Sequence, residues 1–495
     1  MTPPTTVAKA ITALATCWVV ACSTVPPSST PSPMHFDAAR YQTQQLTVEG
    51  QTFTVRAYEN LVYVAHPVDA ATQSMNIYVP EAYFHGQAVG KFTAQTAPIF
   101  LPNQIGGYMP AKPGTPTGRT GPPGESPRAS TIAVALSKGF VVASPGARGR
   151  TTPTGKAPAA IVDLKAAVRF LRFHDARMPG DAEKIISNGT SAGGAMSALL
   201  GASGNSPDYA AALQALGAAD ARDDIFAVSA YCPITNLEHA DSAYEWLFNG
   251  VNEYKKIDIS MLDFQVQRKE VAGSLGAEQI RLSADLKAQF PAYLNSLALR
   301  SPQGQPLALD GARQGSFKDY VQSLVVASAQ TALDQGKDLS GLAWLTVQGG
   351  VVRGIDWDAY LRYAGRMKLP PAFDALDLSS GENQLFGTAS IDKQHFTAAS
   401  AQRSTAPGAA QADAQTVKQM NAMAYIGTAR TAHFWRIRHG TKDRDTSLAI
   451  PVILATTLQN QGYAVDFALP WDVPHSGDYD LAELFAWMAR ISTAP

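Results

Sequence analysis

The alternation of short apolar strands with amphipathic helices is the feature that most constrains the fold of this chain. Between residues 50 and 235, expected strands such as 97–103 (APIFLPN) and 140–146 (FVVASPG) alternate with expected helices such as 130–139 (STIAVALSKG). Helices placed between successive strands are typical of a mostly parallel sheet that is covered on both faces. The sequence therefore predicts an α/β fold.

The other expected elements extend this rhythm to the C-terminus. A helix is expected where Ile161, Leu164, Val168 and Leu171 share one apolar face. Further helices are expected at 192–200, 445–460 and 480–491. The further expected strands are 51–58, 61–67, 75–81, 183–189, 225–233, 433–440 and 463–470.

The rhythm is interrupted between about residues 236 and 430. Stretches of helical character fill this region, among them 244–251, 260–275, 316–336 and 356–368. An insertion of this size is too long for a structureless loop, and ligands of open α/β sheets bind outside the carboxyl ends of the strands. We therefore predict a large, mainly helical cap or lid that is inserted late in the sheet.

The N-terminus is typical of a targeting segment. Lys9 precedes an uncharged, mostly apolar stretch at 10–21, which is too short to span a bilayer but long enough for a secretory signal. It ends in VVAC, which resembles a bacterial lipobox and makes Cys22 the expected lipidated residue. Residues 23–33 are rich in Pro, Ser and Thr and suit a disordered tether. An ordinary signal peptide with an incidental Cys22 is the alternative.

These features divide the chain into four predicted segments. They are a lipoprotein signal peptide (1–21), a tether (22–45), a catalytic domain (46–235 and 431–495) and the inserted cap (236–430). Ser23 directly follows the proposed anchor, which favours the outer membrane by analogy with lipoprotein sorting. We therefore expect a protein that is lipid-anchored in the bacterial cell envelope, facing the periplasm or the surface.

Charge and cysteine content exclude several classes of protein. The chain has 40 basic and 41 acidic residues, so it lacks the basic excess that drives nucleic-acid binding. Of the three cysteines, Cys17 lies in the signal and Cys22 at the anchor, which leaves only Cys232 in the mature body. A single thiol forms neither an internal disulfide nor a Cys-rich metal site. We interpret Cys232 as a small buried hydrophobe and expect no metal and no organic cofactor.

The segment 189–193 (GTSAG) matches the G-x-S-x-G pattern of a nucleophile elbow. An expected strand precedes Ser191 and an expected helix follows it. A nucleophile at such a sharp turn needs a strained backbone, and small neighbours let strand and helix approach closely. The alternative is an ordinary serine at a Gly- and Ala-rich helix start. The flanking elements favour the nucleophile and hence an α/β-hydrolase fold.

An α/β-hydrolase carries its acid, and then its histidine, in loops after late strands. Asp443 and His475 occupy such loops in the required order. The local pattern leaves Asp445 as a rival acid, and His439 is a rival base that precedes the acid. In the predicted mechanism the histidine takes the proton of Ser191, and the acid orients the imidazole.

The predicted oxyanion hole consists of two backbone N–H groups. One belongs to Ala192, directly after the nucleophile, and the other to the loop after strand 97–103. Gly106 and Gly107 are the candidates in that loop, although a Gly pair is also an ordinary turn signal.

Six stretches of the chain carry a resemblance to a known family: IGGYMP, SPGARGRTTPTGKAP, NGTSAGGAMSALLGASGNSPDY, YCPITNLEHADSAYEW, RHGTKDRDTS and PWDVPHSGDYD. Through them the chain resembles the bacterial tannases, or tannin acyl hydrolases. The resemblance implies a triad of Ser191, Asp443 and His475, and so assigns the acid to Asp443. Fungal tannases and their feruloyl-esterase relatives place cysteines beside the catalytic serine and histidine, whereas Thr190 and Ser476 stand there in this chain.

The same resemblance implies how a substrate ring is held. Lys368 and Glu382, in GRMKLPPAFDALDLSSGENQLFG, and Asp445 match the charged residues that grip a trihydroxyphenyl ring in that family. Without this motif, both insertion residues would be interpreted as solvated surface charges. Phenol hydroxyls donate strong hydrogen bonds to carboxylates, and a site built for them rejects rings that lack them.

The resulting prediction is a serine esterase that hydrolyses galloyl esters, such as tannins and alkyl gallates, through an acyl-enzyme. A feruloyl or other phenolic-acid esterase on the same scaffold is the nearest alternative. A serine peptidase of the prolyl-oligopeptidase type is disfavoured, because its propeller would precede the hydrolase domain. A surface-binding lipoprotein without activity is disfavoured too, since a binding module needs no triad.

Overall fold

The computed structural model describes residues 34–117, 130–262 and 265–493. These residues fall within one compact unit, Pro33–Pro495. The predicted signal peptide and the first part of the predicted tether, including Cys22, lie outside the described residues.

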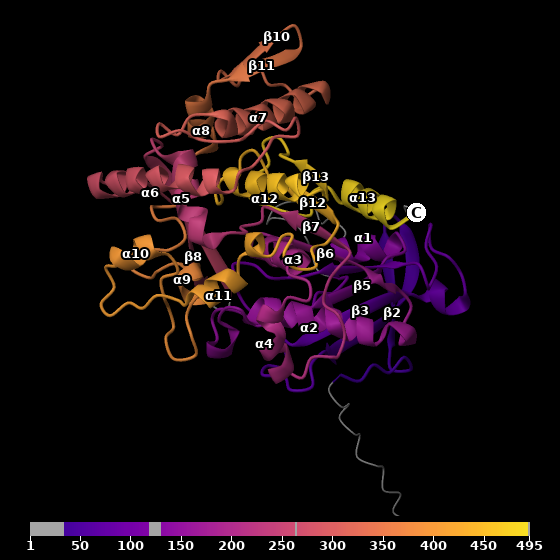
Figure 1. Ribbon diagram of the computed structural model, residues 1–495. Helices are drawn as coiled ribbons and strands as arrows, with labels where there is room; N and C mark the ends of the chain where they lie inside the picture. The colour runs from indigo at the N-terminus through magenta and orange to yellow at the C-terminus, as the bar shows by residue number, and fades with distance from the viewer. Residues whose placement is uncertain (1–33, 118–129, 263–264, 494–495) are drawn as a thin grey trace, which may run out of the picture. The chain divides into compact units, whose positions relative to one another are not determined.

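A nine-stranded sheet forms the centre of the described part of the chain (Figure 1). In spatial order its strands are β1 (Gln42–Val48), β2 (Gln51–Val62), β3 (Ser74–Pro80), β5 (Val141–Pro145), β4 (Pro98–Pro102), β6 (Asp181–Thr190), β7 (Ala227–Tyr231), β12 (Phe434–Arg438) and β13 (Ala464–Ala468). The first four strands pair antiparallel, and every pair from β5 onward is parallel. This confirms the predicted mostly parallel α/β sheet.

The N-terminal strands differ from the prediction in two respects. Strand β1 starts at Gln42, so the predicted domain start at residue 46 falls inside it. Strand β2 covers the first expected strand, 51–58, and continues to Val62, so it includes only the first two residues of the second expected strand, 61–67. Its pairing with β3 is irregular between Tyr58 and Leu61. Asn60 has a φ of 59° there, which is typical of a β-bulge. A polar interruption that suggested a strand end is therefore an irregularity within one strand.

Helices pack on the sheet in two groups. Helix α1 (Thr131–Ser137) packs against α13 (Leu481–Thr493), and α2 (Ala159–Phe173) packs against α3 (Ala192–Ala202) and α4 (Ala210–Ala215). Helix α3 also contacts β6 and β7 and is buried at every position. Its sequence is therefore small and apolar all round rather than on one face.

The insertion between β7 and β12 contains helices and two β-hairpins. Its first helix, α5, packs against α6 and also against α12 (Ala449–Asn460), which follows β12. The insertion thus shares one compact unit with the sheet. Its elements are α5 (Leu237–Phe248), β8 (Glu253–Leu262), β9 (Gln265–Ser274), α6 (Ala277–Ser296), α7 (Ser316–Asp334), β10 (Leu345–Gln348), β11 (Val351–Ile355), α8 (Trp357–Ala364), α9 (Gly381–Leu385), α10 (Ala398–Gln402) and α11 (Ala414–Gln419).

The helix expected at 260–275 is wrong, because β8 and β9 pair antiparallel across this region. Ile257, Ile259 and Met261 recur at every second position of the sequence. That is the period of a strand rather than of a helix, and it agrees with the hairpin.

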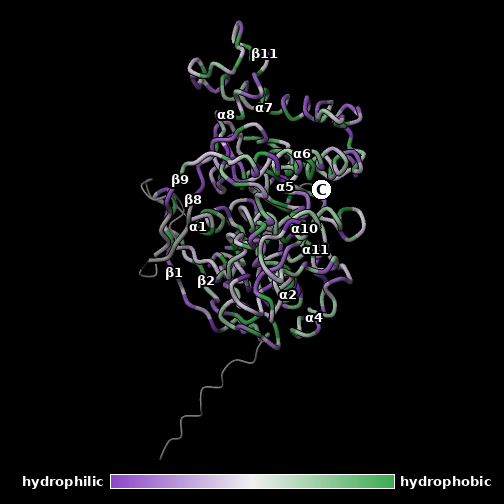
Figure 2. Tube along the Cα trace, turned by 90° about the vertical axis from the view of Figure 1, so that its left-hand side faces the viewer, coloured by the Kyte–Doolittle hydropathy of each residue, from purple (hydrophilic) through white to green (hydrophobic). Residues whose placement is uncertain are grey.

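The long helices of the insertion each bury one face. Along α6 and α7, hydrophilic and hydrophobic residues alternate (Figure 2), and Leu286, Phe290, Val321 and Val325 are among the buried ones. Of the helices in the described residues, none combines the length and the apolar character that crossing a membrane requires.

Candidate active site

Ser191 occupies a sharp turn between β6 and α3. Its φ is 59° and its ψ is −124°, and its N–H donates to the carbonyl of Tyr231 at 3.0 Å. A Cβ on Gly189 would lie 2.3 Å from the carbonyl oxygen of Gly193, and a Cβ on Gly194 would lie 2.4 Å from that of Tyr231. Only glycine fits at these two positions, so the sequence GTSAGG is what allows the strained turn.

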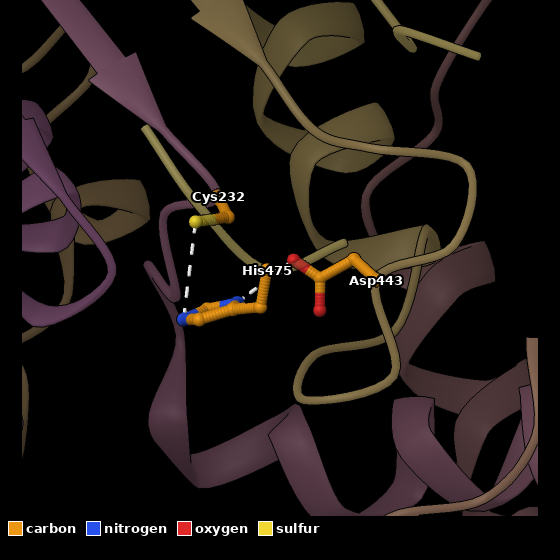
Figure 3. A group of neighbouring side chains, drawn as sticks. All are labelled: Cys232, Asp443 and His475. Atoms are coloured by element: carbon orange, nitrogen blue, oxygen red, sulfur yellow. Dashed lines mark hydrogen bonds and ion pairs between the residues drawn. The ribbon is translucent and has the colours of Figure 1, made fainter. Parts of the chain in front are cut away.

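Asp443 and His475 meet in the loops after β12 and β13. His475 Nδ1 lies 2.8 Å from Asp443 Oδ2 (Figure 3). The other carboxylate oxygen of Asp443 accepts from the N–H groups of Asp445 at 2.9 Å and Thr446 at 3.2 Å. The structure thus brings Asp443, and not Asp445, to the histidine.

Asp443 and His475 each favour the charged form of the other. Burial disfavours a charged carboxyl, but the two histidines, His475 and His439, and the hydrogen bonds to Asp443 together outweigh it and hold the pKa of Asp443 below its usual value. Burial also disfavours a charged imidazole, yet Asp443 raises the pKa of His475 well above its ordinary value. Asp443 is therefore suited to stabilise an imidazolium.

The loop after β13 that carries His475 lies beside the turn that carries Ser191. A Cβ on Gly477 would lie 1.9 Å from Thr190 Oγ1, directly before Ser191. His475 Nε2 faces Cys232 Sγ at 3.9 Å (Figure 3), and no hydrogen bond between Ser191 and His475 is present in the described part of the chain. Burial raises the pKa of the Cys232 thiol. Cys232 is buried as predicted, but no sequence pattern indicates its contact with the histidine.

The loop after β4 is fixed against the serine turn by Asn103. Its Nδ2 donates to the carbonyl of Gly193 at 3.1 Å, and its Oδ1 accepts from the N–H of Ile105 at 3.2 Å. In the described residues, the N–H groups of Ala192, Gly106 and Gly107 donate no hydrogen bond. Of the two glycines, Gly106 lines a cavity of about 520 Å³ together with Ser191.

Lys368 and Asp445 form an ion pair with Glu382 nearby. Lys368 Nζ lies 3.2 Å from Asp445 Oδ1 and 3.8 Å from the centre of the Phe373 ring. Burial works against a charged Asp445, but Lys368 and His475 together outweigh it and lower the pKa of that carboxyl. Burial raises the pKa of Glu382, although the charge of Lys368 counteracts it. The three predicted ring-binding residues therefore share one electrostatic environment.

Tyr108 also belongs to this environment and is not among the residues predicted from the sequence. Its side chain is buried, and after burial itself the charges of Glu382 and Asp445 raise the pKa of its hydroxyl. Its position in IGGYMP, directly after the Gly pair, is the only sequence signal that pointed to it.

Tyr244 connects the insertion to the loop after β12, which carries Asp443 and Asp445. Its hydroxyl accepts from the N–H groups of Met367 at 3.1 Å and Lys368 at 3.0 Å, and donates to the carbonyl of Arg444 at 2.9 Å. One buried hydroxyl thus fixes the backbone on both sides of the Lys368–Asp445 ion pair.

Helix α9, which carries Glu382, is held by a buried carboxylate. Asp374 Oδ1 accepts from Asn383 Nδ2 at 2.7 Å and pairs with His395 Nδ1 at 2.7 Å. Its Oδ2 accepts from the N–H and the hydroxyl of Thr397 at 2.8 Å and 2.7 Å. Asn383, the next residue after Glu382, is therefore fixed by a polar network in which Asp374, Asn383 and His395 are fully buried.

Arg150 joins the two halves of the site. Its Nε donates to the carbonyl of Gly107 at 2.8 Å, and its Nη1 donates to Gln384 Oε1 at 2.5 Å. The loop after β4 and helix α9 are therefore linked by one guanidinium.

The sheet order, the strained serine turn and the Asp443–His475 pair define an α/β-hydrolase. A family model described as BD-FAE, from an α/β-hydrolase family, matches residues 124–275, and no curated protein matches the chain. A solved tannin acyl hydrolase in complex with ethyl gallate shares 50% identity, with 93% of this chain and 99% of that chain covered and a TM-score of 0.87. The chain belongs to the bacterial tannases, which are carboxylic ester hydrolases.

Two further solved structures show the same similarity. A tannase from Lactobacillus plantarum is 49% identical, with 93% of this chain and 99% of that chain covered and a TM-score of 0.89. The Fusobacterium nucleatum tannase is 48% identical, with 94% of this chain and 100% of that chain covered and a TM-score of 0.87.

Proposed function

We propose that this chain hydrolyses galloyl esters through a triad of Ser191, His475 and Asp443. The observation that carries the proposal is the hydrogen bond of 2.8 Å between His475 Nδ1 and Asp443 Oδ2, in a loop that packs beside the strained serine turn. Since Nδ1 is bound to the carboxylate, Nε2 is the nitrogen left to accept a proton.

The reaction proceeds through an acyl-enzyme. Ser191 Oγ attacks the ester carbonyl carbon while His475 Nε2 takes its proton, and the imidazolium then protonates the departing alcohol. Water next attacks the acyl-enzyme with His475 as the base, which releases the acid and restores Ser191. The hydrogen bond between Ser191 and Nε2 forms in the substrate complex, since such bonds are often absent before substrate binds.

Two backbone N–H groups stabilise the oxyanion. Ala192 supplies one and Gly106 the other, because Gly106 lines the same cavity as Ser191 and neither N–H donates elsewhere. Each donor of this kind contributes about 3 to 4 kcal/mol to the transition state.

The charged set of Lys368, Glu382 and Asp445 recognises the ring hydroxyls. A phenol hydroxyl donates to a carboxylate and accepts from an ammonium, and each such bond is strengthened by the charge. Removing the hydroxyls would leave these charges without partners, so poorly hydroxylated rings are rejected. A relative of 50% identity that is described with ethyl gallate supports this choice of acid.

The rates on methyl gallate and methyl ferulate test the proposal, with Ser191→Ala as the blank. A strong preference for the gallate is expected. Comparable rates, or a preference for the ferulate, would make the chain a general phenolic-acid esterase. Wild-type turnover by Ser191→Ala would overturn the triad itself.

We also propose that the enzyme is anchored in the cell envelope by a lipid on Cys22, with residues 236–430 acting as a cap on the catalytic domain. The lipobox-like VVAC and the Pro-rich segment after it support the anchor. Expression of wild type and Cys22→Ser in a Gram-negative host tests it. The wild type should fractionate with membranes and incorporate a labelled fatty acid, and the variant should do neither.

A further inference from the structure

Cys232 faces the catalytic histidine although the proposed hydrolysis does not use it. It follows β7 directly, its Sγ lies 3.9 Å from His475 Nε2, and its side chain is buried. The backbone turns to a φ of 39° at this residue, and its N–H is fixed to the carbonyl of Arg438 at 2.7 Å. The thiol is thus held at the nitrogen that the proposed reaction needs.

Cys232, Asp443 and His475 together have the composition of a metal site. One possible ligand atom from each residue lies within 4.8 Å of the other two. Thiolate and imidazole are the ligands that Zn²⁺ and similar thiophilic cations prefer. With Zn–S of about 2.3 Å, Zn–N of about 2.0 Å and a tetrahedral angle, Sγ and Nε2 would lie about 3.5 Å apart. The observed separation differs from this by a few tenths of an ångström.

The second coordination sphere also fits. Metal-binding histidines usually donate their other ring N–H to a carboxylate, which orients the ring. Asp443 Oδ2 already holds His475 Nδ1 in this way. The carboxylate also supplies negative charge next to the place that a cation would occupy.

A fully buried histidine beside this cluster provides an independent observation. His439 Nδ1 lies 3.7 Å from Asp443 Oδ2, and neither of its ring nitrogens has a hydrogen-bond partner among the described residues. Buried polar groups without partners are uncommon and often mark the position of a water molecule or an ion. The polar groups around Asp443 are therefore not fully satisfied by the protein alone.

We propose that Cys232 and His475 bind a thiophilic divalent cation such as Zn²⁺, and that the bound cation blocks the esterase. On binding, the Cys232 thiol gives its proton to solvent, Sγ and Nε2 each donate an electron pair to the cation, and no electron is transferred. The Nε2 lone pair is then no longer available to take the proton of Ser191. The inhibition rests on the proposed function, whereas the binding does not.

Binding is measured without substrate by equilibrium dialysis of the full chain against Zn²⁺ and by the thiolate-to-metal absorption of Co²⁺. The variants are Cys232→Ala, His475→Ala and Ser191→Ala, with the exposed His433→Ala as a matched histidine control. Wild type, Ser191→Ala and His433→Ala should each bind one more cation than Cys232→Ala and His475→Ala. The Co²⁺ absorption of wild type should exceed that of Cys232→Ala, whose Cys17 and Cys22 remain. Equal binding by wild type and Cys232→Ala would overturn the site.

Inhibition is then measured on methyl gallate. Zn²⁺ should reduce the wild-type rate at least tenfold at saturation, EDTA should restore it, and the residual rate of Cys232→Ala should change less than twofold. Equal loss of activity in wild type and Cys232→Ala would overturn the proposed inhibition. Because dialysis needs no turnover, an inactive wild type that binds Zn²⁺ through Cys232 would contradict the esterase proposal and leave the metal site standing.

Discussion

Lys368 Nζ lies 3.2 Å from Asp445 Oδ1, and each side chain keeps only about a fifth of its surface exposed, 20% and 19% respectively. The lysine comes from the insertion and the aspartate from the loop after β12. The two parts of the chain therefore meet in a partly buried ion pair. Such a pair is costly to break from one side, because the remaining charge loses its partner without regaining full hydration.

Asp445→Asn should weaken hydrolysis of methyl gallate far more than that of methyl benzoate, which has no ring hydroxyls. Losing a hydrogen bond to a charged group costs about 1.5–3 kcal/mol, which corresponds to a fall in kcat/KM of roughly 10- to 150-fold. Equal losses on both esters would show that the carboxylate does not recognise hydroxyls.

Asp443→Asn distinguishes the two neighbouring acids. Replacing the carboxylate that holds the catalytic imidazole lowers turnover by about 10⁴-fold in a serine triad, so we expect a loss of that order on every ester, methyl benzoate included. Single-turnover rates of Asp443→Asn and Asp445→Asn on methyl benzoate provide the comparison. Similar small losses in both variants would contradict the assignment of Asp443.

Glu382 should produce a pH dependence in KM for gallate. Burial raises the pKa of this carboxyl, although Lys368 and Arg150 oppose the shift while Asp445 adds to it. Glu382 must be ionised to accept a hydroxyl, so KM should increase as the pH falls through this raised pKa, above the ordinary range of glutamate. When KM is measured between pH 4 and pH 8, this increase at low pH should be absent in Glu382→Gln. If KM still increases at low pH in this variant, the titrating group is not Glu382.

Tyr244→Phe should destabilise the enzyme and also raise KM for gallate. The change leaves the N–H groups of Met367 and Lys368 without their acceptor. An unsatisfied buried donor costs about 1–3 kcal/mol. Denaturant unfolding measures the stability, and kinetics on gallate and benzoate esters measure the effect on Lys368. A stability loss with unchanged KM on both esters would restrict Tyr244 to a structural role.

Asn383→Ala should act on recognition rather than on chemistry. Its amide fixes helix α9 to Asp374, so its loss should let Glu382 move. We expect KM for methyl gallate to increase several-fold, because one hydrogen bond such as that between Asn383 and Asp374 contributes about 1 kcal/mol. The kcat on methyl benzoate should stay within about twofold, because this hydrogen bond does not involve the reacting groups. The reverse pattern would place Asn383 in the chemical step.

The elements around Ser191 could be predicted because their signals are local. The turn is specified almost entirely by the segment around it: a buried strand, the small residues of 189–193 (GTSAG) and an apolar helix. The loops of Asp443 and His475 were predictable for the same reason, since each directly follows a strand. The hairpin β8–β9 is not evident from composition, because polar and apolar residues are mixed along it, and only the two-residue period indicates strands.

The contacts that support the candidate site could not be predicted, because they join distant parts of the chain. Arg150 and Gln384, or Tyr244 and Arg444, have no spacing that could reveal their pairing. The contact of Cys232 with His475 depends on the relative position of β7 and the loop after β13, which the sequence does not specify. Only the family resemblance pointed to Lys368 and Glu382.

Arg150 donates through Nε to the loop of Gly106 and Gly107 and through Nη1 to helix α9. Under the proposed function, a ring that binds beside Glu382 would therefore position, through this guanidinium, the backbone proposed to face the developing negative charge. A substrate with the wrong substitution pattern would be bound less tightly and would also react more slowly once bound. Selectivity in this enzyme should accordingly be shared between affinity and turnover number, and engineering only the walls of the ring pocket would change both.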